Sequence, residues 1–109
     1  MDITIKALAD YLAERYEGWC NEQGMFMKLV EELGEVAEVL NKRAGRKTAN
    51  AENLQEALGT ELADLIHYIV AIAAINHIDL QQIMLEKDRK ASIKYGHPVN
   101  LETFLKNRK

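Results

Sequence analysis

The chain has 109 residues, of which 48% are apolar and 28% charged, with a formal net charge of −3. This length is typical of one domain, so we expect residues 1–109 to fold as a single unit. The acidic balance argues against a nucleic-acid-binding protein, and the first residues lack the features of a signal peptide, which predicts a soluble cytoplasmic protein.

The first two elements in the chain are predicted helices. Apolar residues at three- and four-residue steps indicate a helix at about residues 4–16, which ends near Gly18. Residues 21–24 are expected to form a loop. A second helix follows at about residues 25–44, with basic residues in its last turn and Gly45 just beyond as a stop signal.

The third and fourth predicted helices begin with residues that can cap them. Asn53, followed three residues later by Glu56, favours the start of a helix that runs to about residue 76. Asp79 is the expected cap of a helix at about residues 80–95. The third and fourth helices are therefore placed at about 53–76 and 80–95, and no segment has the alternation of a strand.

The apolar surface of the third helix exceeds what one small bundle can cover. Residues 62–75 are apolar around most of the helix, which predicts a subunit interface between apolar helix faces. The most apolar run, residues 65–75, is shorter than the ~20 residues of a membrane-spanning helix, so no membrane partner is expected. Beyond Pro98, one short helical turn is expected at about 100–104. We predict an all-α, four-helix bundle that forms a homodimer or homotetramer.

Two pairs of acids lie among these apolar residues. Glu32 and Glu35, with Glu31 beside them, are three residues apart, and Glu61 and Asp64 repeat this spacing. If the two helices pack side by side, four inward carboxylates repel one another unless they are protonated or neutralised. A hard divalent cation with oxygen ligands, Mg²⁺ or Mn²⁺, is the natural candidate. The alternative is that these acids form a solvated helix face.

The sequence Lys28-Leu-Val-Glu-Glu-Leu-Gly-Glu35, followed by Glu61-Leu-Ala-Asp64, resembles a known signature. It is similar to the E-E-x-x-E … E-x-x-D motif of the MazG-like all-α nucleoside triphosphate pyrophosphohydrolases, a superfamily that includes dimeric dUTPases, dCTP pyrophosphatases and phosphoribosyl-ATP pyrophosphohydrolase. The resemblance covers roughly residues 19–95. It implies a four-helix-type fold, assembly as dimers or tetramers, and Mg²⁺-dependent cleavage of a nucleotide between its α and β phosphates.

The resemblance assigns roles to the five acids. Glu32 and Glu35 match the first metal-binding pair, and Glu61 and Asp64 match the second. Glu31 matches the leading acid, which is either a further ligand or the group that orients the attacking water. Glu31 or Glu35 is the candidate general base that accepts the proton of this water.

Basic residues on the fourth helix are candidates for holding the phosphates. Lys87, Lys90, Lys94 and Tyr95 resemble a K-x-x-K-N-x-x-R/K-Y stretch of some family members. Ala91 stands where an asparagine is often found, which is a departure from that pattern. The alternative for these lysines is a solvated helix face.

Other residues are weaker candidates. Lys28, one turn before Glu32, either pairs with that acid or reaches a phosphate. Trp19 and Phe26 flank the predicted loop, and either is a base-stacking ring or a core residue. His67, three residues after Asp64, is either a metal ligand or a packed histidine.

We infer a Mg²⁺-dependent hydrolase that converts an NTP or dNTP into a nucleoside monophosphate and pyrophosphate in a house-cleaning role. The alternatives are a phosphoribosyl-ATP pyrophosphohydrolase and a non-catalytic helical interaction module. A di-iron carboxylate bundle would instead carry Glu-x-x-His pairs, and here the third positions are Glu35 and Asp64.

Overall fold

The computed structural model describes residues 1–18, 21–45 and 53–108. Within these ranges the chain is helical and contains no strand, which confirms the all-α prediction. The helices are α1 (Ile5–Arg15), α2 (Glu22–Arg43), α3 (Leu54–Ile75), α4 (Leu80–Tyr95) and α5 (Leu101–Asn107).

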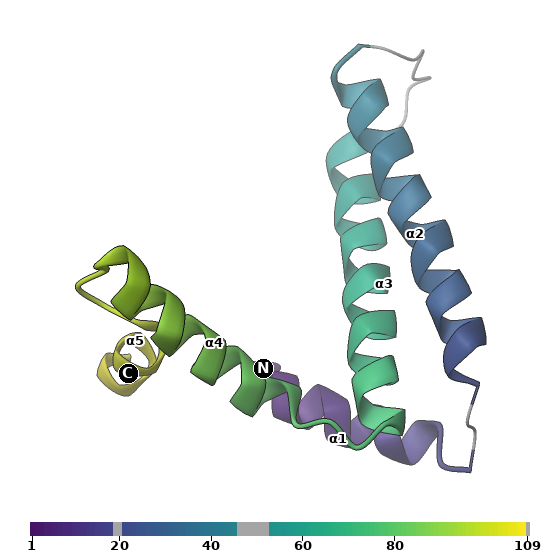
Figure 1. The fold of residues 1–109 in the computed structure, drawn as a ribbon. Helices are drawn as coiled ribbons and strands as arrows, with labels where there is room; N and C mark the ends of the chain where they lie inside the picture. Colours follow the sequence, from purple (N-terminus) through teal and green to yellow (C-terminus); the bar gives the residue numbers. More distant parts are fainter. Residues whose placement is uncertain (19–20, 46–52, 109) are drawn as a thin grey trace.

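Helices α2 and α3 form an antiparallel hairpin, which is the centre of the fold (Figure 1). Helix α1 lies across the end of α3, and α4 leaves from that end and runs away from the hairpin (Figure 1). Helix α4 contacts α1 and α5. The radius of gyration is 17.2 Å, whereas a compact domain of this length has about 13 Å. One chain therefore supplies the helices of a bundle without closing it.

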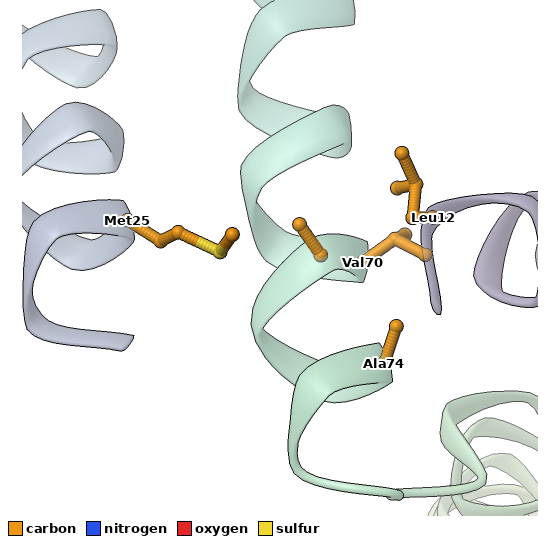
Figure 2. Packing of buried hydrophobic residues seen from close by; sticks show 5 residues of the cluster. Leu12, Met25, Val70 and Ala74 are labelled. Carbon is orange, nitrogen blue, oxygen red and sulfur yellow. The ribbon is translucent and has the colours of Figure 1, made fainter. Parts of the chain in front are cut away.

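The core joins three helices through a few small and medium apolar side chains. Leu12 of α1 is fully buried against α3, next to Val70 and Ala74, and Met25 of α2 reaches α3 from its other side (Figure 2). Full burial of a side chain such as Leu12 contributes about 2 kcal/mol. This cluster fixes α1 and α2 on opposite sides of α3.

Helix α2 starts three residues before the predicted position. Asn21 accepts a hydrogen bond from Gly24 N at 3.0 Å and so caps the helix, which begins at Glu22 rather than at about residue 25. A Cβ on Gly24 would lie 2.5 Å from the Asn21 side chain, so the glycine makes room for the cap. The predicted caps Asn53 and Asp79 are confirmed, each accepting from a backbone N–H at 3.0 Å.

The turn between α3 and α4 contains a residue in the left-handed region. His77 has a φ of 57° and follows Asn76, the last cap of α3. Two hydrogen bonds close the turn, from His77 N to Ala74 O at 3.2 Å and from Ile78 N to Ala73 O at 2.9 Å. This is a Schellman motif with histidine at the position that usually holds glycine.

Helix α5 is longer than the single turn predicted at about 100–104. Asp88 of α4 accepts a short hydrogen bond, 2.6 Å, from Leu101 N. Arg89 then pairs with Glu102 at 2.9 Å. These contacts with α4 anchor the first turn of α5.

One side of the hairpin is apolar and exposed, and we call it the hairpin face. Its side chains are 43–58% exposed. Each of them comes directly after a residue whose side chain is buried or half-buried. Successive residues are roughly 100° apart around a helix. In two antiparallel helices, the residues that directly follow the inward positions therefore point to the same side of the pair. The hairpin face consists of Phe26, Val30, Leu33 and Leu40 of α2 and Leu62, Ile66 and Ile69 of α3.

Among the described residues, α3 is long and apolar enough to cross a membrane by length and composition. It has 22 residues and a hydropathy of 1.6 over its most apolar window. The prediction from the short run at 65–75 considered only part of this helix. The central helix of a helical protein can be equally long and apolar, and α3 packs on both α1 and α2.

Candidate metal centre

Three carboxylates from the two hairpin helices converge. Glu32 of α2 and Glu61 and Asp64 of α3 each offer an oxygen atom, and these oxygens lie within 4.8 Å of one another. All three residues are half-buried. Their convergence follows from the packing of α2 on α3 and from the three-residue spacing on α3, which places Asp64 on nearly the same face as Glu61.

Among the described residues, two oxygens of this cluster have no hydrogen-bond partner. Oε2 of Glu32 and Oε2 of Glu61 are buried, and neither has a hydrogen-bond partner. The nearby Glu32 carboxylate, followed by that of Glu35 and by the loss of hydration, raises the pKa of Glu61 to about 7. At neutral pH about half of the molecules therefore keep on Glu61 a proton that an isolated carboxylate would have released.

This donor set fits a hard divalent cation. The oxygens converge from two helices, and two of these carboxylates each have a buried oxygen that lacks a hydrogen-bond partner among the described residues. Mg²⁺ and Mn²⁺ prefer carboxylate oxygens. A cation would remove the repulsion that the proton on Glu61 now relieves, so the arrangement is suited to exchange a proton for a metal.

The other two predicted acids lie at the edge of this cluster. Glu35 is exposed and outside the group of converging oxygens, yet it is near enough to contribute to the raised pKa of Glu61. Glu31 is also exposed, and its carboxylate pairs with Lys28 at 3.4 Å. Lys28 therefore pairs with Glu31 and not with Glu32 in the structure.

The predicted phosphate-binding lysines lie on another part of the molecule. Lys87, Lys90 and Lys94 are exposed along α4, which leads away from the hairpin (Figure 1). Tyr95 is 65% exposed, and Lys94 lies over its ring at 5.3 Å. The structure does not bring this group to the acids of the same chain. Trp19 lies outside the described residues.

A polar pair that the sequence did not predict lies one turn beyond Asp64. The hydroxyl of Tyr16, at the end of α1, is 2.9 Å from Nε2 of His67 on α3. The ring of His67 also meets that of Tyr68 edge-on, with centroids 5.1 Å apart. His67 is thus a packed histidine, as one of the two predictions held, and it is not among the converging ligands.

Comparison with known proteins identifies the family to which this chain is similar. Residues 21–95 match the family described as the MazG nucleotide pyrophosphohydrolase domain. The chain is 34% identical over 83 residues to dCTP pyrophosphatase 1 of Mus musculus, an alignment that covers 72% of this chain and 49% of the relative. It is 31% identical over 72 residues to the uncharacterized protein YpjD of Bacillus subtilis (strain 168), covering 66% of this chain and 65% of the relative.

The match to dCTP pyrophosphatase 1 extends to a second species. The protein of Rattus norvegicus is 32% identical over 83 residues, with 72% of this chain and 49% of the relative covered. The chain therefore spans about half the length of these relatives. The matched region, residues 21–95, includes the hairpin, the acidic cluster and α4.

Proposed function

Because the chain belongs to the MazG nucleotide pyrophosphohydrolase family, we propose that it hydrolyses an NTP or dNTP between the α and β phosphates. The products are a nucleoside monophosphate and pyrophosphate, and the role is the removal of non-standard or excess nucleotides in the cytoplasm. The observation that carries the proposal is the convergence of Glu32, Glu61 and Asp64, with two buried carboxylate oxygens that lack a partner.

In this proposal the acidic cluster binds Mg²⁺ or Mn²⁺. Glu32, Glu61 and Asp64 would hold the cation, and Glu35, which lies beside Glu61, would complete the set from the edge. When bound, the cation would polarise phosphoryl oxygens and lower the pKa of a water molecule. Glu61 has to release its proton to serve as a ligand, since its pKa is about 7.

Glu35 is better placed than Glu31 to act as the general base. Hydrolysis adds one water across the P–O–P bond, so one proton of that water must be accepted as the oxygen attacks phosphorus. Glu31 is already paired with Lys28 at 3.4 Å, whereas Glu35 lies beside Glu61 and is exposed. We therefore assign proton acceptance to Glu35 and the orientation of water to Glu31.

A second copy of the chain is part of the proposal. The hairpin face exposes seven large apolar side chains, and such a surface usually marks an interface. Glu35 comes three residues after Glu32, and Asp64 comes three residues after Glu61. A three-residue step turns about 60° in the direction opposite to a one-residue step, so Glu35 and Asp64 are turned away from the hairpin face. A partner packed on the hairpin face would close a bundle as a dimer or tetramer and leave the acids accessible.

The lysines of α4 are proposed to act across the oligomer. Helix α4 leads away from its own hairpin (Figure 1), so Lys87, Lys90 and Lys94 can reach the acidic cluster only in another copy. The positive charge of these lysines would stabilise the negative charge of the departing pyrophosphate. If these lysines instead form a solvated helix face, their removal should leave the activity unchanged.

The test is a nucleotide panel in which pyrophosphate release is measured with Mg²⁺. The relatives named dCTP pyrophosphatase 1 make dCTP the first substrate to assay, and phosphoribosyl-ATP is included as the alternative. Glu35→Gln should abolish release, whereas Glu14→Gln, which removes the same charge from an exposed position of α1, should not. If no nucleotide yields pyrophosphate and Mg²⁺ leaves the melting temperature unchanged, the proposal fails and the hairpin face favours an interaction module.

A further inference from the structure

The hydrogen bond between Tyr16 and His67 joins α1 to α3 beside the acidic cluster. The two polar atoms are 2.9 Å apart and partly buried, and the rings meet edge-on with an interplanar angle of 80°. The residues are 51 positions apart in sequence. Tyr16 is the cap residue of α1, so the bond fixes the end of that helix at a defined point on α3.

This pair continues the line of the acids along α3. Glu61, Asp64 and His67 follow one another at three-residue intervals, and each step advances about 4.5 Å and turns the side chain by about 60° around the helix. The line therefore leads from the contact with α2 toward the contact with α1. In the other direction the next member is Leu58, which is apolar and half-buried.

A nucleotide held by its phosphates at the acids must extend its nucleoside one way or the other. The direction toward Leu58 offers no hydrogen-bonding side chain at the next step of the line, whereas the direction toward His67 offers an imidazole and the Tyr16 hydroxyl. Within the described residues, His67 hydrogen-bonds through Nε2 only, which leaves Nδ1 for a ligand. Sugar hydroxyls and base edges need partners of this kind.

Docking of α1 does not by itself require this polar pair. Leu12, one turn before Tyr16, is fully buried against Val70 and Ala74 and already anchors the helix. An apolar contact at positions 16 and 67 would serve the same purpose without the need to satisfy two polar groups. The presence of polar atoms at this point is explained if they also meet the substrate.

We propose that the Tyr16–His67 pair forms the nucleoside subsite, in which the two side chains position the sugar or base of the nucleotide. This inference rests on the proposed function. The pair acts on positioning rather than on the bond that breaks, and it discriminates among nucleotides through hydrogen bonds that a mismatched nucleoside leaves unmade.

The experiment compares Tyr16→Phe and His67→Leu with the wild-type protein. Each variant should raise KM for the preferred nucleotide by several-fold to about tenfold, with kcat nearly unchanged. His67→Gln, which keeps a polar group at this position, should recover part of the loss. Inorganic tripolyphosphate has no nucleoside, so its inhibition constant should be the same for every protein. Comparing dNTP with NTP, and one base with another, distinguishes a sugar contact from a base contact.

The matched control is Leu12→Ala, which weakens the docking of α1 without touching the polar pair. It should lower the melting temperature and leave KM unchanged at a temperature well below unfolding. Unchanged KM in both Tyr16→Phe and His67→Leu overturns the inference, as does a parallel rise in the tripolyphosphate constant. A wild-type protein that hydrolyses no nucleotide overturns the proposed function itself, so the two failures are distinct.

Discussion

The raised pKa of Glu61 predicts how pH affects the protein without metal. The pKa of Glu61 is about 7 because of the adjacent Glu32, compared with 4.5 for an isolated group. Between these pH values the folded state keeps a proton that the unfolded chain has lost. The free energy of unfolding should therefore fall as pH rises from about 4.5 to about 7 and level off above this window.

Binding of Mg²⁺ should have the opposite dependence, since the cation replaces that proton. With a pKa of about 7, roughly a tenth of Glu61 is ionised at pH 6 and roughly nine tenths at pH 8, so the apparent affinity should be about tenfold weaker at pH 6. At a concentration 100 times Kd, the cation adds about 2.7 kcal/mol to the free energy of unfolding. For a chain of this length that raises the melting temperature by roughly 10 °C.

The assay is a titration of the melting temperature with Mg²⁺ at pH 6 and at pH 8. Glu61→Gln should abolish both the fall of stability with pH in metal-free protein and the rise produced by Mg²⁺. Glu14→Gln, which removes an exposed acid from α1, should keep both. Equal Mg²⁺ affinities at the two pH values, or a Glu61→Gln protein that still responds to Mg²⁺, would refute the reasoning about this cluster.

Three further predictions concern the oligomer and one turn of the chain. Purified mixed oligomers that pair Asp64→Asn with Lys87→Ala protomers should recover about half of the activity of the wild-type dimer, although each variant alone is inactive, because one of two shared sites is intact; no recovery in isolated mixed dimers would contradict a lysine supplied by the partner. Ile66→Glu should convert the protein to monomers in light scattering, because it places a charge on the hairpin face, whereas Tyr11→Glu on exposed α1 should not; an unchanged mass would contradict the interface. His77→Gly should raise the free energy of unfolding by about 0.5–1 kcal/mol, measured by chemical denaturation, because glycine adopts a φ of 57° without strain; a less stable variant would contradict this account of the turn.

Local signals in the sequence were sufficient for most helix boundaries. The caps at Asn53 and Asp79 depend on bonds to residues three positions away, so a short window of sequence contains the whole signal. Helix α2 was placed too late because Gly24 was taken as part of a loop, whereas it makes room for the Asn21 cap. The local sequence predicted a turn of α5, but the bond of Leu101 N to Asp88 spans 13 positions, and no local pattern reveals it.

The candidate site was predicted in outline. The three-residue spacing identified the acids, because spacing alone determines which side chains share a face of a helix. It could not determine which oxygens converge, since that depends on how far each helix is rotated toward the other. Glu35 consequently lies at the edge, and Lys28 pairs with Glu31. The bond between Tyr16 and His67 required the position of α1 on α3, which the sequence did not supply.

The single turn at His77 controls the direction in which α4 projects. Helix α4 has 16 residues, so it is a rigid lever of about 24 Å, and a change of 10° at its base would carry its far end by about 4 Å. Gln81 in the first turn of α4 accepts a hydrogen bond from Lys6 N of α1 at 3.2 Å. This bond limits such a rotation of α4. The amino-terminal helix therefore sets the reach of a cationic surface that lies well beyond its own contacts.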